Sequence, residues 1–130
     1  MEVYTLALIG AGGLVGAISR YLLSGWVQGN YSGFPYGTLA VNFTGSLLLS
    51  VIMYLSEYST GMPSNVRILL TVGFLGAYTT MSTFGFESFR LLEQGETVRF
   101  LLNLLGTNAL VLVGVWLGRL IALRLSGVAA

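Results

Sequence analysis

Long uncharged stretches dominate this sequence, because its 130 residues include only six basic and five acidic ones. The uncharged runs occupy residues 3–19, 21–56, 68–86 and 100–118, and turn-forming residues 28–37 interrupt the longest of them. A helix needs about 20 predominantly apolar residues to cross the roughly 30 Å hydrocarbon layer of a bilayer. The sequence therefore predicts four membrane-spanning helices, over about residues 3–25, 37–57, 65–92 and 97–124.

The composition favours an integral membrane protein over other classes. Charged residues make up 8% of the chain, against about 25% in ordinary soluble domains, so they cannot cover a water-facing surface. A net charge of +1 gives no electrostatic footprint for a nucleic-acid partner. The sequence has no cysteine and no histidine, which removes disulfides, thiol nucleophiles and the usual general base. We predict one all-α transmembrane domain over residues 1–130, without a cleaved signal peptide, because no basic region precedes the first span.

The third predicted span is unusual because small and polar residues occupy its centre. These residues are Gly73, Gly76, Thr79, Thr80, Ser82 and Thr83. A broken helix is tolerated at membrane depth where it is buried in protein or lines a wet cavity, and the break supplies free backbone groups for ions. We predict a break near residues 76–80. The alternative is a continuous helix whose Ser and Thr side chains bond back to its own carbonyls.

The positive charges give no orientation signal. With four spans, three arginines fall on each side of the membrane: Arg67, Arg119 and Arg124 on the amino-terminal side, and Arg20, Arg90 and Arg99 on the other. Because positive charge on short loops sets orientation, a chain that inserts both ways and pairs antiparallel would show this tie, as would chance. Four helices also leave little room for a hydrated path between them, so transport would require a homodimer.

Two Gly-x-x-x-Gly motifs allow helices to approach closely. Gly12 and Gly16 form one motif, and Gly114 and Gly118 form the other. The pattern is a weak signal in a chain with 18 glycines. It predicts packing either within a subunit or between subunits.

Several polar side chains lie in apolar surroundings and need partners there. Arg20, near the end of the first span, either snorkels to the interface or functions inside the membrane. Asn42 either donates to an anion or bonds a neighbouring helix, and Glu87 either pairs with Arg20, faces an aqueous vestibule or marks the end of its helix. Asn103 and Thr107 share one face of the fourth span, where they either bond other helices or meet water.

The residues near the predicted break permit an anion path. They offer amide and hydroxyl donors, which suit a small and strongly hydrated anion, and Glu87 is the only acid close to the centre. Aromatic ring edges are electropositive, so aromatic side chains near the break can also contact an anion. These aromatic residues are Phe74, Tyr78, Phe84 and Phe86.

Three segments resemble the hallmark motifs of the Fluc/CrcB fluoride channel family. They are GAGGLVGAISRY at residues 10–21, FPYGTLAVNFTGS at 34–46 and RILLTVGFLGAYTTMSTFGFE at 67–87. Their order, their spacing and the total length agree with the family, so the resemblance spans essentially the whole chain. It implies a dual-topology, antiparallel homodimer in a prokaryotic cell membrane. Such a dimer exports fluoride passively through two pores and has no catalytic residues.

The resemblance also implies roles for individual residues. A structural sodium ion at the dimer centre would be held by main-chain carbonyls of Gly76 and Thr79 from both subunits, and such oxygens suit a hard cation. The anion pathway would comprise Asn42 with the hydroxyl track of Ser82 and Thr83. The other matched positions are Thr38 and Phe84 in the pathway, Asn103 and Thr107 as less specific pore-lining residues, and Arg20 and Glu87 near a vestibule.

One position departs from the family pattern. Met81 stands where the family has the first phenylalanine of a pair, and Phe84 retains the second. Methionine is flexible and polarizable, but it offers no aromatic edge to an anion. We keep Met81 among the pathway residues and expect either that Tyr78 substitutes for the missing ring or that the ring is dispensable.

Two other functions fit parts of the pattern. A small multidrug-type transporter also has four short helices and can be antiparallel, but it needs a buried carboxylate in its first span, where this chain has only Glu2 at the edge. A non-transporting membrane assembly subunit would use the polar centre of the third span for packing. That function leaves the long motif at 67–87 unexplained.

Overall fold

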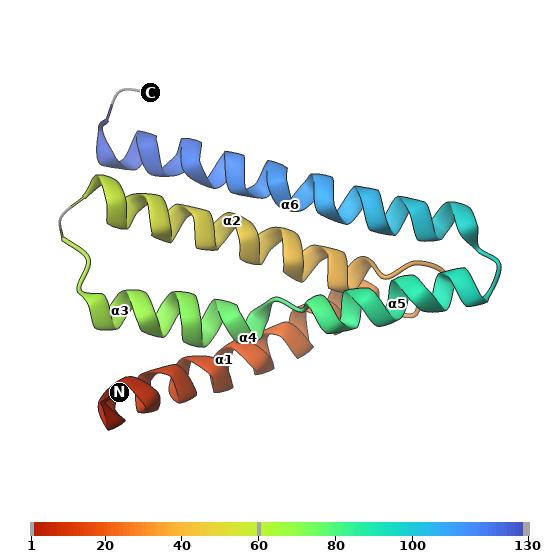
Figure 1. The fold of residues 1–130 in the computed structure, drawn as a ribbon, viewed down its shortest axis with the longest axis horizontal. Helices are drawn as coiled ribbons and strands as arrows, with labels where there is room; N and C mark the ends of the chain where they lie inside the picture. The colour runs from red at the N-terminus through yellow and green to blue at the C-terminus, as the bar shows by residue number, and fades with distance from the viewer. Residues whose placement is uncertain (1, 60, 129–130) are drawn as a thin grey trace.

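The computed structural model describes residues 2–59 and 61–128, which form helices joined by short loops (Figure 1). The first two spans are α1 (Val3–Gln28) and α2 (Tyr36–Tyr58), and the fourth is α6 (Thr97–Ser126). The third span consists of α3 (Ser64–Ile68), η1 (Leu69–Leu75), α4 (Gly76–Tyr78) and α5 (Met81–Glu93), of which η1 is π-helical. The all-α fold predicted from the sequence is confirmed for this part of the chain.

Each of the four spans is long and apolar enough to cross a membrane. Their bounds, Val3–Gln28, Tyr36–Tyr58, Ser64–Glu93 and Thr97–Ser126, reach slightly past the predicted ranges. Large apolar side chains cover the outside of the bundle; for example, Trp26 is 80% exposed. A soluble protein rarely exposes so much contiguous apolar surface. The chain is therefore a multi-pass membrane protein.

Helix α2 is the central helix of the bundle. Figure 1 shows α6 along one side of it and the third span along the other, with α1 packed against the first half of the third span. Within the described residues α1 and α6 make no contact with each other, whereas α2 contacts all the other spans. The buried apolar core of Val41, Leu75 and Tyr78 lies where α2 meets the middle of the third span.

Both Gly-x-x-x-Gly motifs pack within the subunit. A Cβ added at Gly12 would lie 2.5 Å from the Leu69 carbonyl oxygen, so the backbones of α1 and η1 are in direct contact. A Cβ at Gly118 would lie 2.5 Å from the Leu47 carbonyl oxygen, so α6 packs equally closely on α2. The motifs predicted close approach correctly, and the structure identifies the partner helices.

The third span is broken at residues 79 and 80, inside the predicted range. The last helical bond before the break runs from the Thr79 N–H to the Leu75 carbonyl, at 3.1 Å. Thr79 (φ −82°, ψ 159°) and Thr80 (φ −148°, ψ 113°) are both extended, and α5 begins at Met81. A continuous third helix, the alternative considered from the sequence, is therefore wrong.

Candidate functional site

The side chain of Asn42 is bonded to the backbone at the break. Asn42, which is buried in the second turn of α2, donates from Nδ2 to the Thr80 carbonyl (3.0 Å) and accepts the Thr80 N–H at Oδ1 (2.8 Å). Both backbone groups of the most extended residue in the break are thus satisfied from another helix. Of the two alternatives left open for Asn42, a bond to a neighbouring helix is present. An amide nitrogen carries two N–H groups, so this bond leaves the second one for another acceptor.

The side chain of Thr80 begins the second half of the span. Its Oγ1 accepts the Thr83 N–H at 3.2 Å and donates to the Thr83 Oγ1 at 2.9 Å. This is the N-cap arrangement that threonine commonly supplies at a helix start. The cap fixes Thr83 on the first turn of α5.

A central pocket of about 290 Å³ lies beside the break. It is lined by residues from α2, the third span and α6, and it brings together Asn42, Met81, Phe84 and Thr107 with Gly76 and Thr79. Among the described residues that line it, none is charged. Gly45 also lines this pocket, and a Cβ there would lie 3.1 Å from the Tyr78 ring, so only glycine lets α2 approach the break this closely.

The two residues of the altered aromatic pair differ sharply in burial. Phe84 is 4% exposed and packs into the subunit from the first turn of α5, whereas Met81 is 76% exposed. Both residues line the central pocket, Phe84 on the side buried in the subunit and Met81 on the exposed side. The thioether therefore lies where another subunit or lipid would meet the pocket.

A second, smaller cavity of about 200 Å³ connects the first span to the break. Its lining includes Arg20 from α1, Thr38 from α2, and Thr80 and Thr83 from the break and α5. Arg20 is half-buried and faces three threonines. Arg20, whose side chain carries a full positive charge, thus lines the same cavity as Thr38 and Thr83, which the sequence associated with anion passage.

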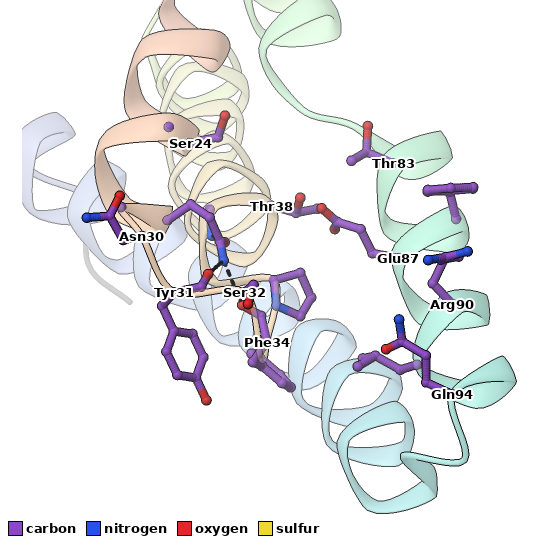
Figure 2. Close-up of a pocket in the computed structure, with 17 residues that line it drawn as sticks. Ser24, Asn30, Tyr31, Ser32, Phe34, Thr38, Thr83, Glu87, Arg90 and Gln94 are labelled. Carbon is purple, nitrogen blue, oxygen red and sulfur yellow. Dashed lines mark hydrogen bonds between the residues drawn. The ribbon is translucent and has the colours of Figure 1, made fainter.

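A third pocket, of about 600 Å³, opens at one end of the bundle (Figure 2). Gln28 shapes its loop wall, because its amide donates to the Phe34 carbonyl (3.0 Å) and accepts the Gly37 N–H (3.0 Å). Figure 2 shows the Thr38 hydroxyl and the Glu87 carboxylate pointing toward each other from α2 and α5. We call this pocket the vestibule.

Glu87 faces the vestibule and forms no ion pair with Arg20. Among the described residues the single ion pair joins Arg99 and Glu96, 3.3 Å apart at the start of α6. The Glu87 Oε2 atom is buried and has no hydrogen-bond partner in that part of the chain. Within the described part of the single chain, Glu87 therefore forms no pair with Arg20, and its side chain lines the vestibule.

A closed polar network joins α5 to α6. Asn103, 1% exposed, donates to the Ser88 Oγ (2.9 Å) and accepts from the Thr107 Oγ1 (3.1 Å). Ser88 in turn donates to the Phe84 carbonyl (2.7 Å). Asn103 and Thr107 therefore share a helix face as their spacing predicted, and this face bonds a neighbouring helix. Ser88 was missed from the sequence, although it lies one turn after Phe84 on the same face.

The predicted site residues fall into three groups in space. Asn42, Met81, Phe84 and Thr107 line the central pocket; Arg20, Thr38 and Thr83 line the smaller cavity; and Thr38, Thr83 and Glu87 line the vestibule. Thr38 and Thr83 line both the smaller cavity and the vestibule, so these two cavities adjoin. Two predicted residues lie outside these pockets in the single chain: Ser82, which is exposed on α5, and Asn103, which is enclosed in its network.

Comparison with known proteins identifies the family of this chain. The family model described as "CrcB-like protein, Camphor Resistance (CrcB)" matches residues 7–119. The chain is 50% identical over 123 residues to "Fluoride-specific ion channel FluC 1" of Methanosarcina acetivorans, covering 95% of this chain and 94% of the relative. It is 46% identical to FluC 3 of Methanosarcina barkeri (95% and 93% covered) and to FluC of Geobacter metallireducens (96% and 99% covered). The chain therefore belongs to the CrcB/FluC fluoride channel family.

Proposed function

We propose that this protein is a fluoride-specific ion channel of the cell membrane, through which F⁻ leaves the cell down its electrochemical gradient. The observation that carries the proposal is the central pocket, in which amide and hydroxyl groups from three spans meet at a helix break without a charged side chain among the described lining residues. Relatives of nearly the full length are fluoride-specific ion channels by name. Passage of an ion involves no chemical step, so the protein is not an enzyme.

The pocket chemistry suits a small anion that must give up water. Hydrogen bonds to a charged partner are shorter and stronger than neutral ones, so the second N–H of Asn42, which lines this pocket, is a suitable replacement for water. The edge of the buried Phe84 ring adds an electropositive contact. A carboxylate in this pocket would favour cations instead. The donor set therefore supports an anion.

We propose a route from the vestibule through the smaller cavity to the central pocket. Thr38 and Thr83 line both outer cavities, so a fluoride ion can be handed from one to the other between hydroxyl groups, with Ser82 beside them on the first turn of α5. The Arg20 guanidinium attracts the anion at this stage. Beyond Arg20 the ion would reach Asn42 and Phe84 in the central pocket. Thr107 also lines this pocket, and its bond to Asn103 holds its side chain in place.

A second copy of the chain would complete the pocket. Gly76 and Met81, on either side of the break, are exposed in the single chain, yet irregular backbone at membrane depth has to be buried in protein or line a wet cavity. The equal division of arginines between the two membrane sides supports an antiparallel partner. We propose a dual-topology homodimer with two pores, related by the dimer axis.

Sodium is the proposed structural ion of this dimer. The fit rests on the break, where Gly76 and Thr79 line the central pocket. In a continuous helix their carbonyls would accept the N–H groups of Thr80 and Thr83, but both N–H groups donate to side chains instead. Main-chain oxygens are suitable ligands for a hard cation. Groups of three or more acidic, Cys or His side chains that could hold a metal ion are absent among the described residues, and the break offers main-chain carbonyls as ligands.

A flux assay tests the proposed function. Liposomes loaded with potassium fluoride or potassium chloride and containing the purified protein are diluted into halide-free buffer, and a potassium ionophore is added. A fluoride electrode should record rapid release of fluoride, and a chloride electrode should record release no faster than from protein-free liposomes. Equal release of both ions would refute fluoride specificity, and release of neither would refute the channel. The small multidrug-type alternative predicts no halide release at all.

Met81→Phe should leave fluoride release within about twofold of wild type. Met81 lies on the outer side of the central pocket and is already large and apolar, and swaps of similar volume usually cost less than about 1.5 kcal/mol. The same electrode assay measures the rate. Complete loss of release would show that the thioether and the aromatic ring are not interchangeable at this position.

A further inference from the structure

We infer that the Asn42 amide and the Thr80 hydroxyl assemble the proposed sodium site, because they take the two backbone N–H groups that would otherwise bond to its carbonyl ligands. Neither side chain is itself a ligand of the ion; both build the site in which the carbonyls bind it. It rests on the sodium site proposed above.

The bonding pattern at the break supports this role. In a continuous α-helix each N–H bonds to the carbonyl four residues earlier, so the Gly76 carbonyl would accept from Thr80 and the Thr79 carbonyl from Thr83. In the structure the Thr80 N–H donates to the Asn42 Oδ1 at 2.8 Å, and the Thr83 N–H donates to the Thr80 Oγ1 at 3.2 Å. The Gly76 carbonyl is therefore released from the Thr80 N–H, and the Thr79 carbonyl is released from the Thr83 N–H. The released carbonyls are the two that the sodium proposal requires.

The two side chains do different parts of this work. Thr80 caps α5 locally, as threonine does at many helix starts. Asn42 reaches the break from α2, 38 residues away in sequence, and satisfies both the N–H and the carbonyl of Thr80. Inside a membrane an unsatisfied backbone group is costly. Without Asn42 the third span would recover its own helical bond, and the Gly76 carbonyl would no longer be available to a cation.

Four variants separate site assembly from general packing. Asn42→Ala removes the acceptor for the Thr80 N–H, and Thr80→Val removes the acceptor for the Thr83 N–H while keeping the side-chain shape. Thr80→Ser retains the hydroxyl. Thr44→Val is the matched control, because Thr44 also joins α2 to the third span beside the break, through a 2.8 Å bond to the Tyr78 hydroxyl, but it touches neither diverted N–H.

The measurement is the melting temperature of each purified protein in detergent, as sodium chloride replaces N-methyl-D-glucamine chloride at constant ionic strength. An ion that binds only the folded protein raises its stability as the ion concentration increases. We expect a saturable rise for wild type, Thr80→Ser and Thr44→Val. In Asn42→Ala and Thr80→Val the sodium concentration at half-maximal rise should increase at least about tenfold, which corresponds to about 1.4 kcal/mol. Gel filtration establishes that each variant has the wild-type oligomeric state.

Each outcome decides a different claim. A wild-type sodium response in both Asn42→Ala and Thr80→Val would overturn the inference and leave the sodium site standing. No sodium response in wild type, with fluoride release intact, would overturn the sodium site and leave the channel standing. If Asn42→Ala does not fold, Asn42→Asp replaces it, because a carboxyl group still accepts the Thr80 N–H. That variant should keep the sodium response, and its loss would overturn the role of Asn42.

Discussion

Fluoride release should fall about 10- to 150-fold when Asn42 is replaced by alanine, since a hydrogen bond to a charged group contributes about 1.5–3 kcal/mol and each 1.36 kcal/mol changes a rate tenfold. Asn42 is buried, lines the central pocket and uses one N–H on the Thr80 carbonyl. Its second N–H is the donor that the ion would lose. The fluoride electrode assay in liposomes measures the effect at equal protein content.

A surface amide provides the control for this prediction. Asn65 is exposed on α3, outside the three pockets, so Asn65→Ala should release fluoride at the wild-type rate. Asn42→Ala has to be compared as a folded protein of wild-type oligomeric state. A wild-type rate in that protein would remove Asn42 from the pathway.

Asn42→Asp divides the two roles of this residue. A carboxyl group can accept the Thr80 N–H, but an ionised one repels fluoride and has no N–H to donate. The expected result is slow fluoride release with the sodium response retained. Fast release from Asn42→Asp would show that the side chain acts on the break alone.

The sequence was sufficient to predict the spans and the break. Charged groups are costly inside a bilayer, so the positions of Arg20, Arg67, Glu87 and Arg99 limit where helices can cross. The break was predictable because glycine, threonine and serine replace leucine and valine at the centre of the third span. Local composition alone carries both signals.

The contacts across the break were not predictable from the sequence. The bond between Asn42 and Thr80 depends on how α2 packs against the third span, and their separation of 38 residues leaves no local trace. Which residues of α5 face the bundle could not be predicted either. Two extended residues, Thr79 and Thr80, interrupt the helical period of 3.6, so the faces of α4 cannot be continued into α5. For this reason the sequence did not show that Ser88 faces inward, whereas Ser82 and Thr83 are both exposed in the single chain.

The partner helices of the glycine motifs required the structure as well. A Gly-x-x-x-Gly motif predicts that some backbone approaches closely, but the approaching backbone belongs to a segment elsewhere in the chain. The π-helical form of η1 was not predicted, since its sequence LLTVGFL resembles an ordinary apolar helix. The contact between η1 and α1 nevertheless decides how the third span is seated, and it leads to the second large effect.

Gly16→Val should prevent recovery of folded protein. A Cβ at Gly16 would lie 2.9 Å from the Phe74 carbonyl carbon and closer still to its oxygen. The obstacle is backbone, which cannot rotate away as a side chain can, so the cost should reach or exceed the upper end of the usual overpacking range of about 1–3 kcal/mol. Because folded proteins are stable by only about 5–15 kcal/mol, displacement of α1 from η1 should leave the break without support.

Gly10→Val is the matched control on the same helix, because among the described residues no atom outside the adjoining backbone of α1 lies within 4 Å of a Cβ built at Gly10. It makes the same chemical change with the same change in helix propensity, but without a collision. The yield of monodisperse protein after gel filtration in detergent should be close to wild type for Gly10→Val and should collapse for Gly16→Val. Equal yields from the two variants would mean that the backbones of α1 and η1 are not in contact in the membrane. In that case the third span would have to be held in place by α2 and α6, and the bond between Asn42 and Thr80 would be its main attachment at the break.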